Sequence, residues 1–230
     1  PSIGVAMFNG QDKDATEFLK QADTAMYQSK AQGRNQVSFF DPQLQAETLK
    51  RNELARLLSL AIEEDEFLLL YQPIYNAQKI NVASEALIRW NCKALGMVSP
   101  ADFIPMAEQS NLILDIGSWV LNSACRQLYL WSLDECKAAW SVAVNISAKQ
   151  LQQVNFVETV KNTVREQGAN PYRLKLEITE SMLMTDVEQT REKLLQLHQQ
   201  GIRFALDDFG TGYSSLAFLK NVPIQVLEID

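Results

Sequence analysis

The stretch that organises this chain is Phe204-Ala205-Leu206-Asp207-Asp208-Phe209-Gly210-Thr211-Gly212-Tyr213-Ser214-Ser215. An apolar run ends there in two adjacent carboxylates, and a turn rich in glycine and hydroxyl groups follows. This pattern predicts a buried strand, an acidic tip, a loop and the start of a helix. Two neighbouring aspartates repel each other unless a positive charge lies between them, and a divalent cation is the usual partner. A solvated acidic turn explains a single Asp-Asp pair at least as well. The choice between a cation site and an acidic turn therefore depends on the rest of the sequence.

The same order of strand, polar residue and helix recurs upstream. Six runs have the character of strands: residues 67–74, 83–90, 141–147, 174–179, 202–208 and 226–230. Helical patterns separate most of them, at residues 101–108, 116–131, 148–167, 187–200 and 214–220. This alternation predicts an α/β fold with a parallel sheet or a (β/α)8 barrel. Only a short turn at residues 76–79 separates the first two runs, so the first strand is predicted to be antiparallel to the second.

Polar residues stand at matching places in these apolar runs, namely Glu85, Asn145, Glu177, Asp207 and Asp208. Alternation along residues 174–179 puts Glu177 on the face opposite the leucines, which would place it inside a barrel near its mouth. Catalytic groups of such barrels come from the carboxyl ends of several strands. A structural ion pair would explain one buried acid, but five oxygen ligands at corresponding positions favour a site.

The chemistry of these side chains favours a hard divalent cation. The only histidine, His198, lies in an amphipathic helical pattern and is expected at the surface, so no His/Cys cluster for zinc is predicted. Carboxylates with an amide suit Mg²⁺ or Mn²⁺, with Ca²⁺ as a non-productive occupant. Asp207 and Asp208 could hold two ions and a bridging water, which would supply hydroxide for displacement at phosphorus. Arg89 could hold a phosphate with two hydrogen bonds, while its neighbour Trp90 is expected to serve packing.

Composition limits the partners and the compartment. The chain has 230 residues, of which 47% are hydrophobic, so it can bury the core of one large α/β domain or two small ones. A net charge of -7 argues against DNA or RNA as the main partner. The three cysteines form no CxxC pair and are expected to be reduced thiols of a cytoplasmic protein. No apolar run approaches the ~18 residues of a membrane span, so no membrane contact is expected.

The first 66 residues are expected to precede the main domain. Residues 2–8 and 37–40 have the character of strands around a helical pattern at residues 15–32, a β-α-β unit too small to hold its own core. Residues 41–66 are predicted to form a linker helix that joins two domains. The expected division is therefore 1–40, 41–66 and 67–230. Because Pro1 begins within a strand-like run and no signal peptide precedes it, the sequence is expected to be a piece of a longer protein.

Several motifs resemble those of the EAL-domain family in order and spacing. They are Tyr71-Gln72-Pro73-Ile74, Glu85-Ala86-Leu87-Ile88-Arg89-Trp90, Phe103-Ile104-Pro105-Met106-Ala107-Glu108, Asn145-Ile146-Ser147, Glu177-Ile178-Thr179-Glu180-Ser181 and Asp207-Asp208-Phe209-Gly210-Thr211-Gly212-Tyr213-Ser214-Ser215-Leu216. Residues 22–35 resemble the closing helix of the GGDEF (diguanylate cyclase) domain. The signature loop of that domain is absent, so the resemblance implies no cyclase activity.

The EAL resemblance implies a TIM-like (β/α)8 barrel with an antiparallel first strand. It also implies hydrolysis of cyclic di-GMP to pGpG with Mg²⁺ or Mn²⁺. By position, the ligands of one metal would be Glu85, Asn145, Glu177 and Asp207, and Asp208 would serve the second. The contacts to the cyclic dinucleotide would come from Gln72, Leu87 and Arg89. Glu180 would support the loop at residues 209–215, which in the family is coupled to dimerisation, so a homodimer is expected.

Three departures from the family pattern stand out. Glu228 occupies the position of a catalytic lysine, Gln225 replaces an upstream aspartate, and Asn91-Cys92-Lys93 stands where a His-Pro is usual. The chain also ends at Asp230, before the seventh and eighth strands of the family barrel and another glutamate of its metal site. The barrel is therefore expected to be truncated after about the sixth strand.

Three hypotheses for function remain open from the sequence. The first is a metal-dependent cyclic di-GMP phosphodiesterase, supported by the intact motif from Glu85 to Arg89. The second is a degenerate, catalytically impaired EAL domain that serves as a cyclic di-GMP receptor or a dimerisation module, supported by Glu228 and the missing strands. The third is another Mg²⁺-dependent barrel enzyme that acts on a carboxylate or phosphate substrate.

Overall fold

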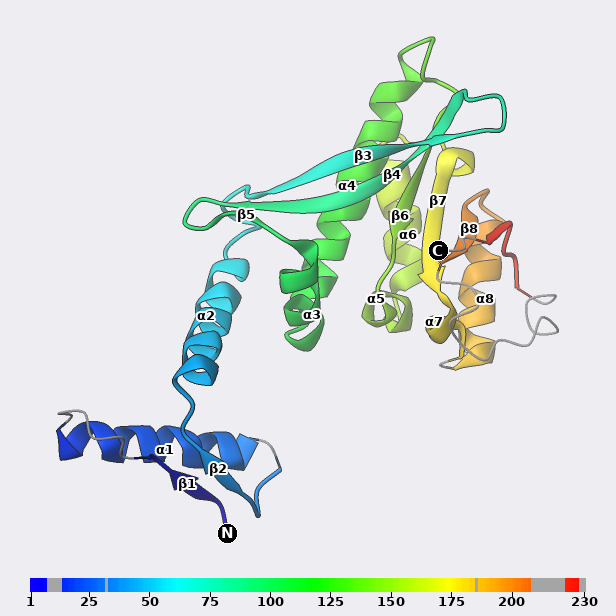
Figure 1. Ribbon diagram of the computed structural model, residues 1–230. Helices are drawn as coiled ribbons and strands as arrows, with labels where there is room; N and C mark the ends of the chain where they lie inside the picture. The colour runs from blue at the N-terminus through cyan, green and yellow to red at the C-terminus, as the bar shows by residue number, and fades with distance from the viewer. Residues whose placement is uncertain (8–13, 32, 185, 208–221, 228–230) are drawn as a thin grey trace. The chain divides into compact units, whose positions relative to one another are not determined.

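A computed structural model describes residues 1–7, 14–31, 33–184, 186–207 and 222–227 (Figure 1). The pattern of contacts in space between residues divides the chain into two compact units, Pro1–Arg56 and Leu57–Asp230. The expected boundaries at residues 40 and 66 lie on either side of this division. None of the described helices is both long and apolar enough to cross a membrane.

The first unit is the predicted β-α-β arrangement. It consists of β1 (Ile3–Val5), α1 (Ala15–Ala31) and β2 (Val37–Phe39), and β1 pairs with β2 in parallel. The helix lies so close to β1 that a side chain at Gly4 would meet the Ala22 carbonyl oxygen at 2.0 Å. A second helix, α2 (Pro42–Leu58), follows and ends before the predicted limit at residue 66.

The second unit is built on one mixed sheet of seven described strands. Their order is β3-β4-β6-β7-β8-β9, and the short strand β5 pairs with the outer part of β4. The strands are β3 (Phe67–Tyr75), β4 (Asn81–Cys92), β5 (Gly96–Val98), β6 (Ser141–Asn145), β7 (Leu174–Thr179), β8 (Arg203–Asp207) and β9 (Val226–Leu227). β3 is antiparallel to β4, whereas β4, β6, β7, β8 and β9 run parallel. The α/β class and the antiparallel first strand are thus confirmed, while closure of a barrel stays a prediction.

The hairpin between β3 and β4 forms where the short turn predicted it. The side-chain oxygen of Asn76 accepts hydrogen bonds from the backbone N–H groups of Gln78 and Ile80, both at 3.0 Å. An asparagine that bonds the backbone two residues ahead is typical of a tight turn. The turn reverses the chain and sets the register of the two strands.

Helices lie between the parallel strands in the sequence and along the sheet in Figure 1. They are α3 (Pro100–Gln109), α4 (Leu112–Ser132), α5 (Ala148–Gln152), α6 (Phe156–Glu166), the 3-10 helix η1 (Pro171–Arg173), α7 (Glu180–Met184) and α8 (Val187–His198). The sequence did not predict β5, η1 or α7. The helical pattern predicted at residues 214–220 lies outside the described residues.

One predicted helix, at residues 148–167, is wrong in its continuity. It is broken into α5 and α6 because Gln153 adopts an extended conformation, with φ −58° and ψ 135°. Lys193 of α8 donates its amine to the carbonyl oxygens of Leu151 at 2.8 Å and Gln153 at 3.0 Å. The amine therefore binds carbonyl groups that a continuing helix would use for its own hydrogen bonds.

Packing at the start of β3 fixes the first two strands. Phe67 lies between Trp90, Phe103 and Trp119, with ring centroids 5.7–6.2 Å apart. Trp90 is fully buried and donates its indole N–H to the Glu66 carboxylate at 2.9 Å, which confirms its expected packing role. A buried aromatic cluster of this kind stabilises a sheet edge through both burial and ring geometry.

Candidate active site

Strand register places the predicted polar residues on one face of the sheet. Residues that pair across neighbouring strands point to the same side, and alternate residues of a strand share a side. The pairs are Gln72 with Glu85, Glu85 with Ala143, Asn145 with Glu177, Glu177 with Ala205, and Thr179 with Asp207. The opposite face of β7 carries Leu174, Leu176 and Ile178, each at most 1% exposed. The alternation expected for Glu177 is therefore confirmed.

Glu85 and Asn145 are joined directly, although 60 residues separate them in the sequence. The side-chain amide of Asn145 donates to Glu85 Oε1 at 2.7 Å. Asn145 is the last residue of β6 and is exposed, whereas Glu85 lies within the long strand β4 and is half-buried. The amide therefore holds one carboxylate oxygen in a defined direction at the carboxyl end of the sheet.

Glu177 is the most deeply buried acid on this face, at 2% exposure. Lys175, two residues earlier on the same face, has its amine 3.5 Å from Glu177 Oε1. Asp207 ends β8 one strand further along and is half-buried. Lys175 was not predicted as a site residue, although the strand alternation that identified Glu177 also places Lys175 on the same face.

The four predicted ligands that the structure describes fit Mg²⁺ or Mn²⁺ in their chemistry, because they are three carboxylates and one amide. They come from four neighbouring strands, β4, β6, β7 and β8. Within the described ranges, however, no three His, Cys, Asp or Glu side chains lie close enough together to form a metal cluster. Asp208 and Glu228 lie outside the described residues, as does the loop at 209–215.

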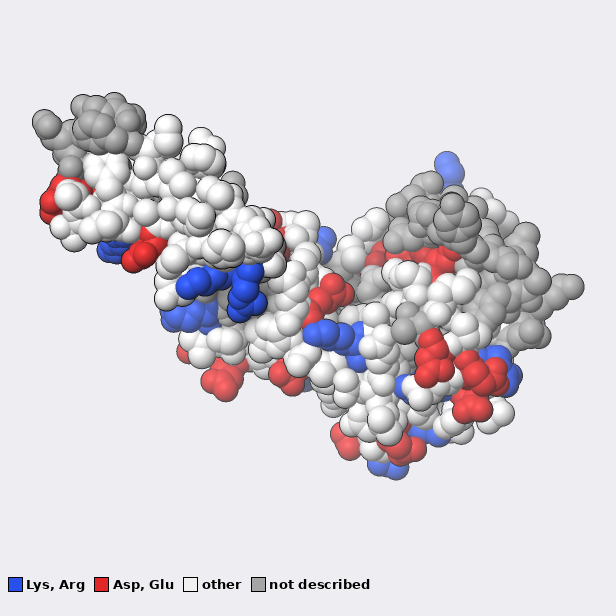
Figure 2. Space-filling view, turned by 90° about the horizontal axis from the view of Figure 1, so that it is seen from below, with Lys and Arg blue, Asp and Glu red and all other residues white. Residues whose placement is uncertain are grey.

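Charged side chains of both signs lie on the surface at this end of the sheet (Figure 2). Figure 2 is seen from below relative to Figure 1, and thus from the side to which β7 points and at which α5 and α7 begin. Several groups of acidic side chains lie on that face of the unit that contains the sheet, with basic side chains between some of them. A local excess of carboxylates raises the concentration of cations near them.

A cavity of about 360 Å³ is lined by Asn145 but not by Glu85, Glu177 or Asp207, and most of its wall is apolar residues of β4, α3 and α4. Leu87 and Arg89, both predicted to contact a ligand, line it together with Asn145, Ser147 and Thr179. Gln72 lies on the same sheet face but does not line the cavity. The Arg89 guanidinium donates to the Ile88 carbonyl oxygen at 2.9 Å, which limits its orientation.

Two further expectations concern Glu180 and His198. Glu180 is the first residue of α7 and is 4% exposed, so it is rigidly placed. The loop that it was expected to support lies outside the described residues. His198 is exposed at the end of α8, 3.3 Å from the Gln225 side chain, and its expected surface position is confirmed.

Carboxylate and amide side chains on neighbouring parallel strands are typical of α/β proteins that carry their functional groups at the carboxyl ends of strands. The chain belongs to the EAL-domain family, whose family model matches residues 55–230. The model of the diguanylate cyclase, GGDEF domain, matches residues 1–36. Both resemblances inferred from the motifs are confirmed.

Among known proteins, the chain is similar to the bifunctional diguanylate cyclase/cyclic di-GMP phosphodiesterase MucR of Pseudomonas aeruginosa. The two are 41% identical over 232 residues, which cover 100% of this chain and 33% of MucR. The cyclic di-GMP phosphodiesterase PdeR of Escherichia coli is 35% identical over 229 residues, covering 100% of this chain and 34% of PdeR. The chain thus spans about a third of the length of these curated relatives.

Solved structures give the same fold. The PaMucR phosphodiesterase in complex with c-di-GMP matches with a TM-score of 0.74 and 41% identity, over 77% of this chain and 72% of that one. The EAL enzyme Bd1971 in its cGMP-bound form matches with a TM-score of 0.72 and 29% identity, over 95% of this chain and 57% of that one.

Proposed function

We propose that this chain is the catalytic module of a phosphodiesterase that hydrolyses cyclic di-GMP to pGpG. The observation that carries the proposal is the cavity in which Leu87 and Arg89 lie beside Asn145, which is hydrogen-bonded to Glu85. A guanidinium suits a phosphate diester, because it can donate two parallel hydrogen bonds. The names of the MucR and PdeR relatives and of the PaMucR complex support the same reaction.

Divalent cations are part of the proposal. The ligands of one Mg²⁺ or Mn²⁺ ion are Glu85, Asn145, Glu177 and Asp207, and Asp208 serves a second ion. When bound, the ions supply an activated water and stabilise the charge that develops at phosphorus. The Asn145 amide keeps the Glu85 carboxylate in its direction through the 2.7 Å hydrogen bond. The Lys175 amine offsets part of the negative charge at Glu177.

Other residues bind and position the ligand. Arg89 binds a phosphate, Leu87 packs against the dinucleotide from the cavity wall, and Gln72 contacts it from the neighbouring strand. Glu180 supports the loop at residues 209–215 from its buried place at the start of α7. The same proposal includes a homodimer, a cytoplasmic location and an EAL domain that begins near residue 67 after a linker helix.

A catalytically impaired receptor or dimerisation module is the alternative function within the EAL-domain family. Glu228 in place of the family lysine is the feature that suggests it. The similarity over the whole chain to proteins named as phosphodiesterases favours the enzyme.

The test is incubation of the full-length protein with cyclic di-GMP and Mn²⁺, with chromatography for pGpG and a separate binding measurement. Turnover is expected. Binding without turnover would favour the receptor, and the absence of both binding and turnover would leave only the dimerisation module. The variant Asp207→Asn should weaken Mn²⁺ binding, whereas Asp115→Asn on the exposed side of α4 should leave it unchanged. Unchanged Mn²⁺ affinity in Asp207→Asn would contradict the assigned ligand set.

A further inference from the structure

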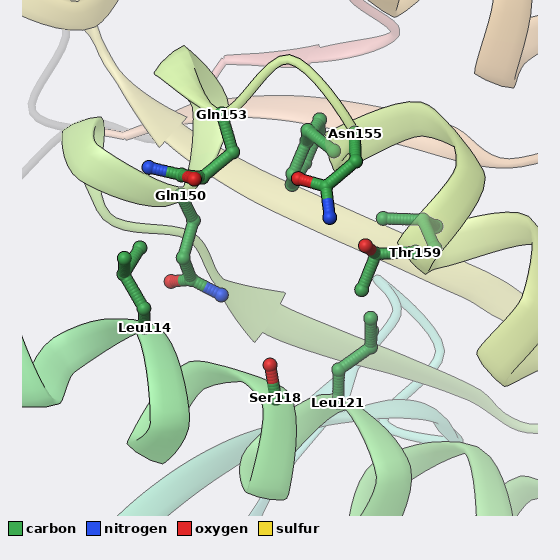
Figure 3. Close-up of a pocket in the computed structure, with 9 residues that line it drawn as sticks. Leu114, Ser118, Leu121, Gln150, Gln153, Asn155 and Thr159 are labelled. Atoms are coloured by element: carbon green, nitrogen blue, oxygen red, sulfur yellow. The ribbon is translucent and has the colours of Figure 1, made fainter.

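A glycine inside a helix requires an explanation, because glycine weakens a helix relative to alanine. Gly117 of α4 is such a residue, and it is buried. A Cβ atom at this position would lie 2.1 Å from Gln150 Nε2 and 2.3 Å from its Cδ. The missing side chain therefore makes room for the amide of Gln150. Figure 3 shows this amide extending from α5 toward α4, between Leu114 and Ser118.

The same amide holds the beginning of α5. Gln150 Oε1 accepts hydrogen bonds from the Ser147 backbone N–H and the Ser147 hydroxyl, each at 3.0 Å. In return, the Ser147 hydroxyl accepts from the Gln150 backbone N–H at 3.3 Å. This reciprocal arrangement is a capping box, which satisfies donors at a helix start. Because α5 has only five residues, it depends on such contacts more than a long helix does.

Ser147 is two residues away from Asn145, which contacts the Glu85 carboxylate. The residue between them, Ile146, is buried and donates its backbone N–H to the Glu177 carbonyl oxygen at 2.9 Å. The segment 145–147 is thus held on one side by β7 and on the other by Gln150. Gln150 also lines the 360 Å³ cavity that contains Arg89 and Asn145.

We propose that Gln150 is a positioning residue for Asn145. Lodged in the space that Gly117 leaves, it fixes Ser147, and Ser147 sets the direction from which the Asn145 amide meets Glu85. Gln150 acts through these residues and not on the substrate. The inference rests on the proposed function in one respect, that Asn145 and Glu85 are metal ligands.

The structure offers room for a displaced Gln150 amide, so we expect the fold to survive when this contact is disturbed. Gln150 also lines a second cavity, of about 130 Å³. Gln150 lines it together with neutral polar and apolar residues such as Ser118, Thr159 and Leu121 (Figure 3). An alanine at position 117 can therefore push the flexible amide into this space. The capping box would then be lost while the helices keep their places.

The first experiment compares two replacements of Gln150 in the full-length protein. Gln150→Glu keeps the acceptor oxygens and is a natural partner in a capping box, whereas Gln150→Leu keeps the volume and loses the acceptors. Mutation of a residue that supports a metal ligand typically lowers metal affinity or activity by about 10-fold or more. We expect Gln150→Leu to lower Mn²⁺ affinity and kcat by about 10-fold, with KM for cyclic di-GMP nearly unchanged. Gln150→Glu should have nearly the same Mn²⁺ affinity, kcat and KM as the parent protein.

The second experiment is a double-mutant cycle between the two helices. Gly117→Ala alone and Gln150→Ala alone should each weaken Mn²⁺ binding. In the Gln150→Ala background the clash is gone, so Gly117→Ala should have no further effect on Mn²⁺ affinity and should raise Tm, as alanine suits a helix better. Effects of contacting residues are expected to be non-additive in this way.

Two results would overturn the inference. One is parent-like Mn²⁺ affinity in Gln150→Leu with only a lower Tm, which would make Gln150 a merely structural residue. The other is an equal loss from Gly117→Ala in both backgrounds. A parent protein that binds Mn²⁺ in the predicted pattern but forms no pGpG would refute the proposed function alone. A parent protein that binds no Mn²⁺ would refute both.

Discussion

The amine of Lys175 lies 3.5 Å from the Glu177 carboxylate within a single strand, β7. Both side chains are largely buried, with exposed fractions of 13% for Lys175 and 1% for Glu177. Because the residues are two apart, they share the sheet face that carries Glu85, Asn145 and Asp207. The acid most removed from water on this face thus has a positive charge beside it within its own strand.

Lys175→Met should destabilise the fold, because it removes a positive charge that lies 3.5 Å from the buried Glu177 carboxylate. Removing one partner of a buried ion pair costs as much as about 3–5 kcal/mol. The free energy of unfolding in urea measures the loss. The control is Lys137→Met, which breaks an exposed pair with Asp134 at 2.9 Å and should cost less than about 1 kcal/mol. Equal losses in the two variants would contradict the importance of the Lys175–Glu177 pair.

Arg89→Ala should weaken binding of cyclic di-GMP. The loss of charge-assisted hydrogen bonds to a phosphate corresponds to about 1.5–3 kcal/mol, or roughly 10- to 150-fold in Kd. Isothermal titration with Ca²⁺ in place of the productive metal measures binding without turnover. Arg126→Ala, on an exposed face of α4, serves as the control. If both variants bind like the parent protein, Arg89 does not contact the phosphate.

Glu228→Lys should raise phosphodiesterase activity by at least ~10-fold, which is about 1.4 kcal/mol of barrier. Glu228 lies outside the described residues, so this prediction comes from the sequence. A negative charge near the attacking water raises the pKa of that water, whereas the lysine of the family lowers it. Steady-state rates with Mn²⁺ test the prediction. A parent protein already as fast as the variant would indicate that Glu228 is no handicap.

Glu66→Gln should lower stability at neutral pH but not in acid. Burial acts to raise the pKa of Glu66, but hydrogen bonds from the Lys93 backbone N–H and the Trp90 indole outweigh it and hold the pKa below its ordinary value. A depressed folded-state pKa gives stability that is present above the unfolded pKa and is lost as pH falls through the folded pKa.

The variant should therefore be less stable than the parent protein by about 1.5–3 kcal/mol at pH 7, and the difference should shrink as pH falls below about 4. Denaturant unfolding at several pH values measures it. Glu63→Gln, at an exposed neighbouring position, should show no such dependence. A difference that stays constant down to pH 3 would contradict the ionised role of Glu66.

The three cysteines should differ sharply in reactivity. Cys92 and Cys125 are buried, and burial raises the pKa of the Cys125 thiol to about 12. Cys136 is exposed. Since the thiolate is the reactive form, iodoacetamide at pH 8 should label Cys136 rapidly and the other two only after unfolding in urea. Peptide mapping by mass spectrometry separates the sites. Rapid labelling of Cys125 in the folded protein would contradict its burial.

Local pattern was enough to predict much of this fold. The strands β3, β4, β6, β7 and β8 coincide closely with apolar runs, and the antiparallel start follows from the short turn that Asn76 organises. These features depend on neighbours a few residues apart, which a sequence displays directly. The same holds for the face of Glu177, because side chains of a strand alternate with a period of two.

Tertiary structure decided what depends on residues far apart in the chain. Lys193 ends α5 from 42 residues away, so a continuous helical pattern became two helices. The Gln150 amide occupies the space that a side chain at Gly117 would need, and nothing in the sequence indicates that these two residues meet. Asn145 meets Glu85 across 60 residues. Periodicity records which side of an element is apolar, but which side chains meet is decided only when the elements pack, because packing acts through space and not along the chain.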